Sequence, residues 1–185
     1  MRIYVRIAPC QSEDIWLNAL NQQENKYNME GSKILTLELT VSDLFAQMKE
    51  HSYYLGEALK SDPKLVELAA KIQASDDDDS ILKDFVQDGG RKLGNVLSRV
   101  LGKTSYSWDE NKTKITFTTN AVSNFMDSQK GTIKDNMLSY LSYYVLSKWL
   151  NIIKPDECPR FDALLVEVEE DMRQLSAQRD KPKRN

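Results

Sequence analysis

Few side chains in this sequence are suited to nucleophilic or metal chemistry. There is one histidine, His51, and there are two cysteines, Cys10 and Cys158, far apart in the chain. They form no CxxC, HxxxH or HExxH spacing, so the usual ligands of a zinc site cannot be assembled from them. A Cys/His nucleophilic pair stays formally open, although passive thiols are commoner than reactive ones. We expect no metal, no cofactor and no catalytic residue.

Carboxylates gather in two runs, Asp76–Asp79 and Glu167–Asp171. The four consecutive aspartates lack the alternating ligands, the central glycine and the distal glutamate of an EF-hand. They precede an apolar helical pattern, so they lie where the positive end of a helix begins, and Asp79 can be its cap. Neither run offers an identifiable acid and base in an apolar setting, and no glycine-rich phosphate loop occurs. An enzyme using carboxylates remains the weakest of three hypotheses.

Composition indicates one globular core. The chain has 185 residues, of which 41% are hydrophobic and 29% charged, and its net charge is only -3. General nucleic-acid binding normally requires a basic excess, so any basic site must be local. No stretch reaches about 18 apolar residues, and the start of the chain alternates as a strand does, which is not the pattern of a signal peptide. We therefore expect a cytoplasmic protein without a membrane segment.

The first part of the chain predicts strands and then helices. Residues 2–8 alternate as a half-buried strand, and a second strand over 34–39 could pair with it. Between them, residues 10–31 are rich in Asn and Gln and predict a long connection. A helix follows from Thr40, with Asp43 completing an acidic capping box, and ends before Pro63, which can open a second short helix.

The middle of the chain predicts a long helix and a hairpin. The helix covers residues 81–101, where the three glycines at 89, 90 and 94 indicate a kink or close helix packing, and Gly102 ends it. Strands at 106–108 and 114–118 then flank a polar turn, which predicts a β-hairpin with Trp108 and Phe117 as cross-strand neighbours. Strands 2–8 and 114–119 are expected to be sheet edges, to which strands of other subunits can be added.

Two helices complete the pattern. Residues 133–153, with a capping box at Thr132 and Asp135, are apolar on nearly every side, so this helix is either the central core helix or a core helix that also faces a partner. The last helix, 160–177, has one apolar stripe and lies outside. Large aromatic side chains make the candidate subunit interface: Tyr140, Tyr143, Tyr144, Trp149, Trp108 and Phe117. The basic tail supplies candidate contacts to DNA or to an acidic partner surface: Arg179, Lys181, Lys183 and Arg184.

These elements predict a mainly α fold with small β elements (α+β). We expect a helical bundle of about four main helices with a β-hairpin and an N-terminal strand-rich extension. The expected organisation is an extension over 1–40, a helical domain over 41–178 with the hairpin at about 105–119, and a basic C-terminal tail over 179–185.

The order of elements over residues 76–180 resembles a known family. An acidic helix start, a hairpin ending in Lys114–Thr118, the aromatic helix Met137–Trp149 and an amphipathic helix after Pro155 look like head-tail connector proteins. These are neck, adaptor or head-completion components of tailed phages and prophages of gut Bacteroidales. The resemblance lies in pattern more than in identity. The strand-rich extension and the segment at 61–75 depart from it, which leaves the neck layer open.

The resemblance implies a virion structural protein of the neck, assembled in the cytoplasm of the bacterial host. It implies a homo-oligomeric ring, commonly of about twelve copies, that meets the portal, other neck or tail proteins and the genomic DNA in the channel. A tail terminator or another neck ring is the near variant. The remaining alternative is a small cytoplasmic regulator that binds another protein through its aromatic helix and has no virion role.

Overall fold

The computed structural model describes residues 32–178. The expected strand 2–8, the connection 10–31 and the basic residues of the tail, Arg179, Lys181, Lys183 and Arg184, lie outside this range. The chain divides after Ser32 into two units, and the helices and the sheet belong to the unit that begins at Lys33. Residues 33–40, which the sequence grouped with the N-terminal extension, therefore belong to the same unit as the helices.

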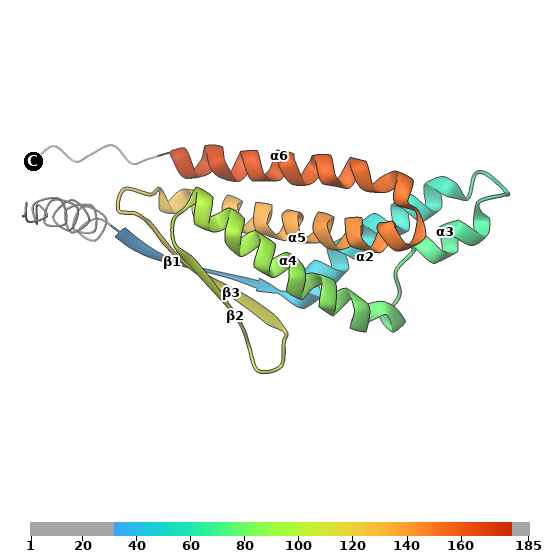
Figure 1. The fold of residues 1–185 in the computed structure, drawn as a ribbon, viewed down its shortest axis with the longest axis horizontal. Coiled ribbons are helices and arrows are strands. Elements are labelled where there is room, and N and C mark those ends of the chain that lie inside the picture. Colours follow the sequence, from blue (N-terminus) through green and yellow to red (C-terminus); the bar gives the residue numbers. More distant parts are fainter. Residues whose placement is uncertain (1–31, 179–185) are drawn as a thin grey trace, which may run out of the picture. The chain divides into compact units, whose positions relative to one another are not determined.

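Five α-helices and a three-stranded antiparallel sheet make up the described part of the chain (Figure 1). This confirms the mainly α fold with small β elements. The strands are β1 (Ser32–Thr40), β2 (Thr104–Trp108) and β3 (Lys114–Val122). The helices are α2 (Val41–Leu59), α3 (Val66–Ile72), α4 (Asp79–Val100), α5 (Lys130–Ile153) and α6 (Cys158–Ala177).

Helix α5 is the centre of the helical layer. Helices α2, α4 and α6 all pack against it, with α6 on the side away from the sheet (Figure 1). This enclosure explains why α5 is apolar on nearly every side, as the sequence indicated. Helix α6 instead buries one stripe that includes Phe161, Val168 and Met172, and so it is the outer helix that was expected.

The sheet differs in its strand order from the expectation. The order is β1-β3-β2, so β3 is the central strand and the expected edge at 114–119 is wrong. The hairpin is confirmed, but Phe117 faces Tyr106, and Trp108 faces Ile115. The inner face buries Phe117 and the alternating leucines of β1 against the helices. Because β1 pairs with the distant β3, the edges of the sheet are β1 and β2. No local pattern specifies such a pairing.

Three of the expected helix caps are built differently. The hydroxyl of Thr40 donates to the side chain of Asp43 and makes no bond to the backbone of α2. Ahead of α4, a short 3₁₀ turn (Asp76–Asp78) places the capping box at Ser75, whose backbone N–H lies 2.8 Å from the Asp78 carboxylate. Asp79 is therefore not the cap. Helix α5 begins at Lys130, after another 3₁₀ turn, so Thr132 lies inside the helix.

The close packing expected at the glycines of α4 is confirmed. A Cβ at Gly89 would lie 2.9 Å from the ring of Tyr144 and 3.1 Å from Leu141, both on α5. The absence of a side chain thus sets how closely α4 approaches α5. Gly90 and Gly94 lie against the ring of Tyr106 on β2, and so α4 contacts the central helix and the hairpin along two adjacent faces.

Asp109 organises the hairpin turn, and its removal is expected to lower the melting temperature. Its carboxylate accepts bonds from the Thr113 hydroxyl (2.6 Å) and from the backbone N–H groups of Thr113 (2.6 Å) and Lys114 (2.7 Å). The Thr113 hydroxyl and then the Lys114 N–H hold the pKa of Asp109 below its ordinary 3.8. A carboxylate whose pKa is lowered by folding stabilises the folded state at pH values above its ordinary pKa. This stabilisation is lost as the pH falls through the lowered pKa of the folded state.

Thermal unfolding of Asp109→Ala against pH measures this contribution. The difference in melting temperature from the unchanged chain should be full near neutral pH and should shrink below about pH 4. Glu110→Ala is the matched control, because the neighbouring carboxylate makes no bond with the described residues. If the difference in melting temperature did not change with pH, the charge of the Asp109 carboxylate would not be what stabilises the turn.

Candidate docking groove

Most of the expected interface residues lie inside the folded unit. Phe117, Tyr140, Tyr144 and Trp149 are buried, and the Trp149 indole N–H donates to the carbonyl of Ile72 at 2.9 Å. The aromatic residues of α5 are covered by α2, α3, α4 and α6, and Phe117 of β3 faces the helices, so the folded surface does not present these side chains to another subunit. Half-buried Trp108 lies at the end of β2.

The hydroxyl of Tyr144 joins α5 to α4. It donates to the carboxylate of Asp88, and the Lys148 amine lies 5.3 Å from the Tyr144 ring centre. The hydrogen bond from Tyr144 lowers the pKa of Asp88, and burial followed by this bond raises the pKa of Tyr144. The lowered pKa of Asp88 keeps its carboxylate charged, and the raised pKa of Tyr144 keeps its hydroxyl protonated. The hydrogen bond that links the two helices requires both.

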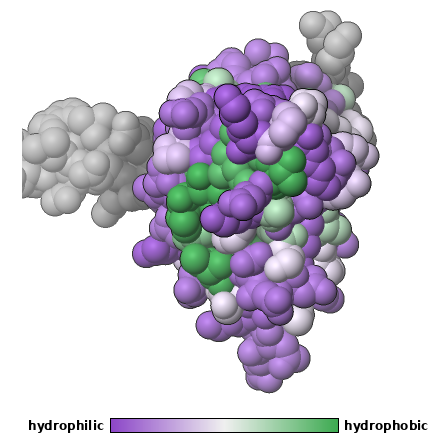
Figure 2. Space-filling model, turned by 90° about the vertical axis from the view of Figure 1, so that its right-hand side faces the viewer, coloured by the Kyte–Doolittle hydropathy of each residue, from purple (hydrophilic) through white to green (hydrophobic). Residues whose placement is uncertain are grey.

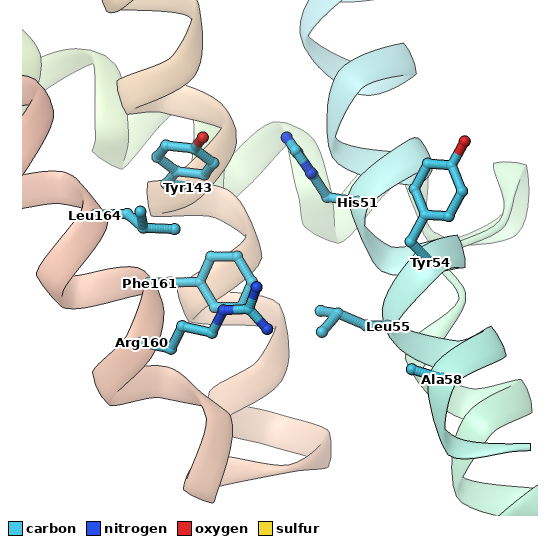
Figure 3. Close-up of a pocket in the computed structure, with 8 residues that line it drawn as sticks. All are labelled: His51, Tyr54, Leu55, Ala58, Tyr143, Arg160, Phe161 and Leu164. Atoms are coloured by element: carbon cyan, nitrogen blue, oxygen red, sulfur yellow. The ribbon is translucent and has the colours of Figure 1, made fainter. Parts of the chain in front are cut away.

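Tyr143 is the expected interface residue that lines an open site. Helices α2 and α6 both pack on α5, and between them is a pocket of about 480 Å³. We call it the α2–α6 groove. The residues that line it come from three helices (Figure 3): His51, Tyr54, Leu55, Ala58, Tyr143, Arg160, Phe161 and Leu164.

A row of rings forms the floor of the groove. The His51 and Tyr143 ring centres are 5.6 Å apart, and those of Tyr143 and Phe161 are 6.2 Å apart. His51 and Leu55 point from α2 toward the other two helices, and the Arg160 side chain lies across Phe161 (Figure 3), with the guanidinium carbon 5.9 Å from the ring centre. The groove thus offers apolar and aromatic contact beside one cation.

Two polar groups in the groove have unmet interactions. The Nε2 atom of His51 is buried without a hydrogen-bond partner. Arg160 is exposed and makes no ion pair with any residue that the structure describes. A buried polar atom without a partner costs about 1–3 kcal/mol, which applies to His51 Nε2. Arg160 is solvated, so pairing it with a carboxylate contributes less.

The groove continues into a smaller pocket, and one end of the unit carries apolar surface. This second pocket, of about 120 Å³, shares Leu55, Ala58 and Arg160 with the groove. Its other lining residues are Leu59, Ile72, Leu150 and Glu157, whose carboxylate is paired with Lys154. Figure 2 looks at the end of the unit that holds α3 and the turn between α5 and α6, and shows apolar side chains framed by hydrophilic ones. Ile152, in the last turn of α5, is 60% exposed. Such framed apolar surface is typical of protein docking sites.

The Cys158 thiol and the carboxylates are the other groups in residues 32–178 whose types could do chemistry. Burial, and then the nearby Asp162, raise the pKa of the Cys158 thiol, whose Sγ lies 3.4 Å from the Ser147 carbonyl. Among these residues, no three His, Cys, Asp or Glu side chains are placed to hold a metal ion. No helix in this range is long and apolar enough to span a bilayer.

The sequence indicated parts of the groove but not the groove itself. Phe161 and Leu164 belong to the predicted stripe of the last helix, and Tyr143 was a candidate interface residue. His51 was considered only as a ligand or base, and Arg160 was not singled out. No local signal connects them, because His51 and Arg160 lie on helices far apart in the chain and adjacent residues of a helix, such as Arg160 and Phe161, do not normally face each other.

Comparisons with protein-family models, with curated proteins and with solved structures found no match to this chain.

Proposed function

We propose that this chain is a virion structural protein, a head-tail connector that forms an oligomeric ring between the portal and the tail of a phage. A tail terminator or another neck ring is the near variant of the same function. The genomic DNA would pass through the ring without sequence-specific contact. The observation that supports the proposal most directly is the sheet, because its two edges suit it to pairing between copies.

The edge at β2 has backbone groups ready for pairing. The backbone N–H of Asn120 donates to the carbonyl of Lys103, and the N–H of Asp109 donates to the carbonyl of Lys114. In an antiparallel pair, residues that bond the neighbouring strand alternate with residues that do not, so the backbone groups of the odd-numbered residues between 103 and 109 face β3. By this alternation, the backbone groups of Tyr106 and Trp108 point away from β3. Within residues 32–178, no other strand pairs with β2 on that side.

A ring requires two different faces on each subunit, joined by a rotation that closes. Strands β1 and β2 flank β3, so in the described range the sheet ends in two different strands. Pairing β2 of one copy with β1 of the next would use both faces and would satisfy backbone donors and acceptors at each joint. The basic tail, repeated around such a ring, would concentrate positive charge toward DNA or an acidic portal surface.

Native mass spectrometry of the purified chain, alone and with the portal protein encoded beside it, tests the proposal. We expect a closed ring, or portal-bound copies that match the portal's symmetry. The double variant Ser105→Lys, Ser107→Lys places two charges on exposed positions of β2 and should reduce assembly while leaving the fold intact. Val166→Lys, on the exposed face of α6, is the control and should assemble normally.

The alternative functions predict different masses. A cytoplasmic regulator should be a monomer or a dimer, should ignore the portal and should be unaffected by the lysines on β2. A monomer that does not bind the portal would overturn the connector proposal. A ring that persists in the double variant would keep the connector function and exclude β2 as the joint.

A further inference from the structure

We propose that the α2–α6 groove binds an amphipathic helix of a partner protein, one that presents large apolar side chains next to a carboxylate. This inference goes beyond the ring and does not depend on it, because it concerns a different surface. The ring proposal uses the edges of the sheet, whereas the groove is formed by three helices.

The first reason is the arrangement of the helices. Helices α2 and α6 lie on α5 with the groove between them, so a helix placed there would contact all three, as one more member of the bundle. Along α2, the lining runs from His51 to Leu59, which corresponds to roughly 12 Å or about two helical turns. A helix bound in a groove uses anchors three or four residues apart, and two turns accommodate such a pair.

The second reason is the chemistry of the lining. Leu55, Ala58, Leu164 and the rings of Tyr143 and Phe161 provide an apolar bed for aliphatic or aromatic anchors. Tyr54, which is 63% exposed, lies at the border of this bed and offers an amphipathic side chain of the kind that is enriched at interfaces. Burying these surfaces is the main source of affinity that the groove offers.

The third reason is charge. Arg160 is held over the Phe161 ring and has no carboxylate partner in the described range, so it is positioned to receive one. The unpartnered Nε2 of His51, which also lines the groove, favours a ligand with an oxygen acceptor or a hydroxyl group. An acidic helix satisfies these groups, whereas a basic helix would place a cation against Arg160. We therefore infer an acidic partner.

Fluorescence anisotropy with two synthetic helical peptides tests this inference. Both carry leucine and phenylalanine on one face of an alanine-rich helix, and one has glutamates beside that face where the other has lysines. We expect the acidic peptide to bind the full chain more tightly than the basic one. Arg160→Glu should weaken the acidic peptide about tenfold and strengthen the basic peptide, because the favourable charge contact is reversed.

Two further variants distinguish the effect of the Arg160 charge on binding from a change in the fold and from a loss of apolar contact. Arg173→Glu, an exposed arginine near the other end of the same helix, should leave both affinities unchanged. Leu164→Ala should weaken both peptides equally. The inference would be overturned if the two peptides bound with equal affinity or if the acidic peptide did not bind. It would also be overturned if the Arg160→Glu chain folded and bound both peptides as the unchanged chain does. Loss of self-association in Arg160→Glu would assign the groove to a second copy instead.

Discussion

Replacing Trp149 by alanine is expected to lower the free energy of unfolding by about 3–5 kcal/mol, the range measured for deleting a large aromatic side chain from a core. Trp149 is only 8% exposed, and its indole N–H bonds the carbonyl of Ile72, the last residue of α3. The substitution leaves a cavity beside α5 and removes the donor from a buried carbonyl. It therefore also weakens the contact of α3, a short helix that packs mainly on α2, with α5.

Denaturant unfolding followed by circular dichroism measures this effect. Trp149→Phe keeps most of the apolar volume and loses the hydrogen bond, so it should cost about 1–3 kcal/mol. Val166→Ala, at an exposed position of α6, should change stability by no more than about 0.5 kcal/mol. If Trp149→Ala unfolded like the unchanged chain but assembled less well, Trp149 would be an interface residue, as the sequence allowed.

The second large effect is expected at Gly102, where alanine should destabilise the chain by about 2–4 kcal/mol. Gly102 has a φ of +123°, a backbone conformation that side chains disfavour. A Cβ there would also lie 2.3 Å from the carbonyl oxygen of Asn120 on β3. Because a backbone atom cannot move aside as a flexible side chain can, the turn from α4 into β2 would have to shift.

The same substitution at Gly131 provides a control of opposite sign. Gly131 lies in the first turn of α5, and a Cβ there would meet nothing within 4 Å. Alanine is the better helix former, so Gly131→Ala should raise the free energy of unfolding by up to about 1 kcal/mol. Both changes are read from the same denaturant curves. Equal effects at the two glycines would show that the contact with Asn120 does not control the turn.

The α2–α6 groove shows why the candidate site was harder to predict than the elements that form it. His51 lies on α2, whereas Tyr143 and Arg160 lie on α5 and α6, and between α2 and α5 the chain forms α3, α4 and the β2–β3 hairpin. The helices α2 and α6 were recognisable from their apolar stripes and α5 from its continuous apolar run, because these patterns are local. The distance between α2 and α6, which determines whether a groove remains, depends on how both pack on α5.

The aromatic residues of α5 illustrate the same division. Their density correctly indicated an enclosed helix, but the sequence left open whether a partner or the chain itself encloses it. The structure answers this for Tyr140, Tyr144 and Trp149, which other helices of the same unit cover. Composition sets the amount of apolar surface to be buried, and only the packing of the helices decides which surface covers it.

By itself, the sequence determined the mainly α class, the hairpin, the enclosed character of residues 133–153 and the end of a helix at Gly102. These follow from periodicity and from backbone preferences that act over a few residues. The tertiary structure alone decided that β3 is central, that Tyr106 rather than Trp108 faces Phe117, and that Arg160 meets Phe161 beside His51 in a groove. Strand order and groove geometry depend on contacts between segments far apart in the chain, which no local pattern encodes. The register of the hairpin is set by its turn, where Asp109 bonds Thr113 and Lys114, and the apolar pattern of the strands did not reveal that turn geometry.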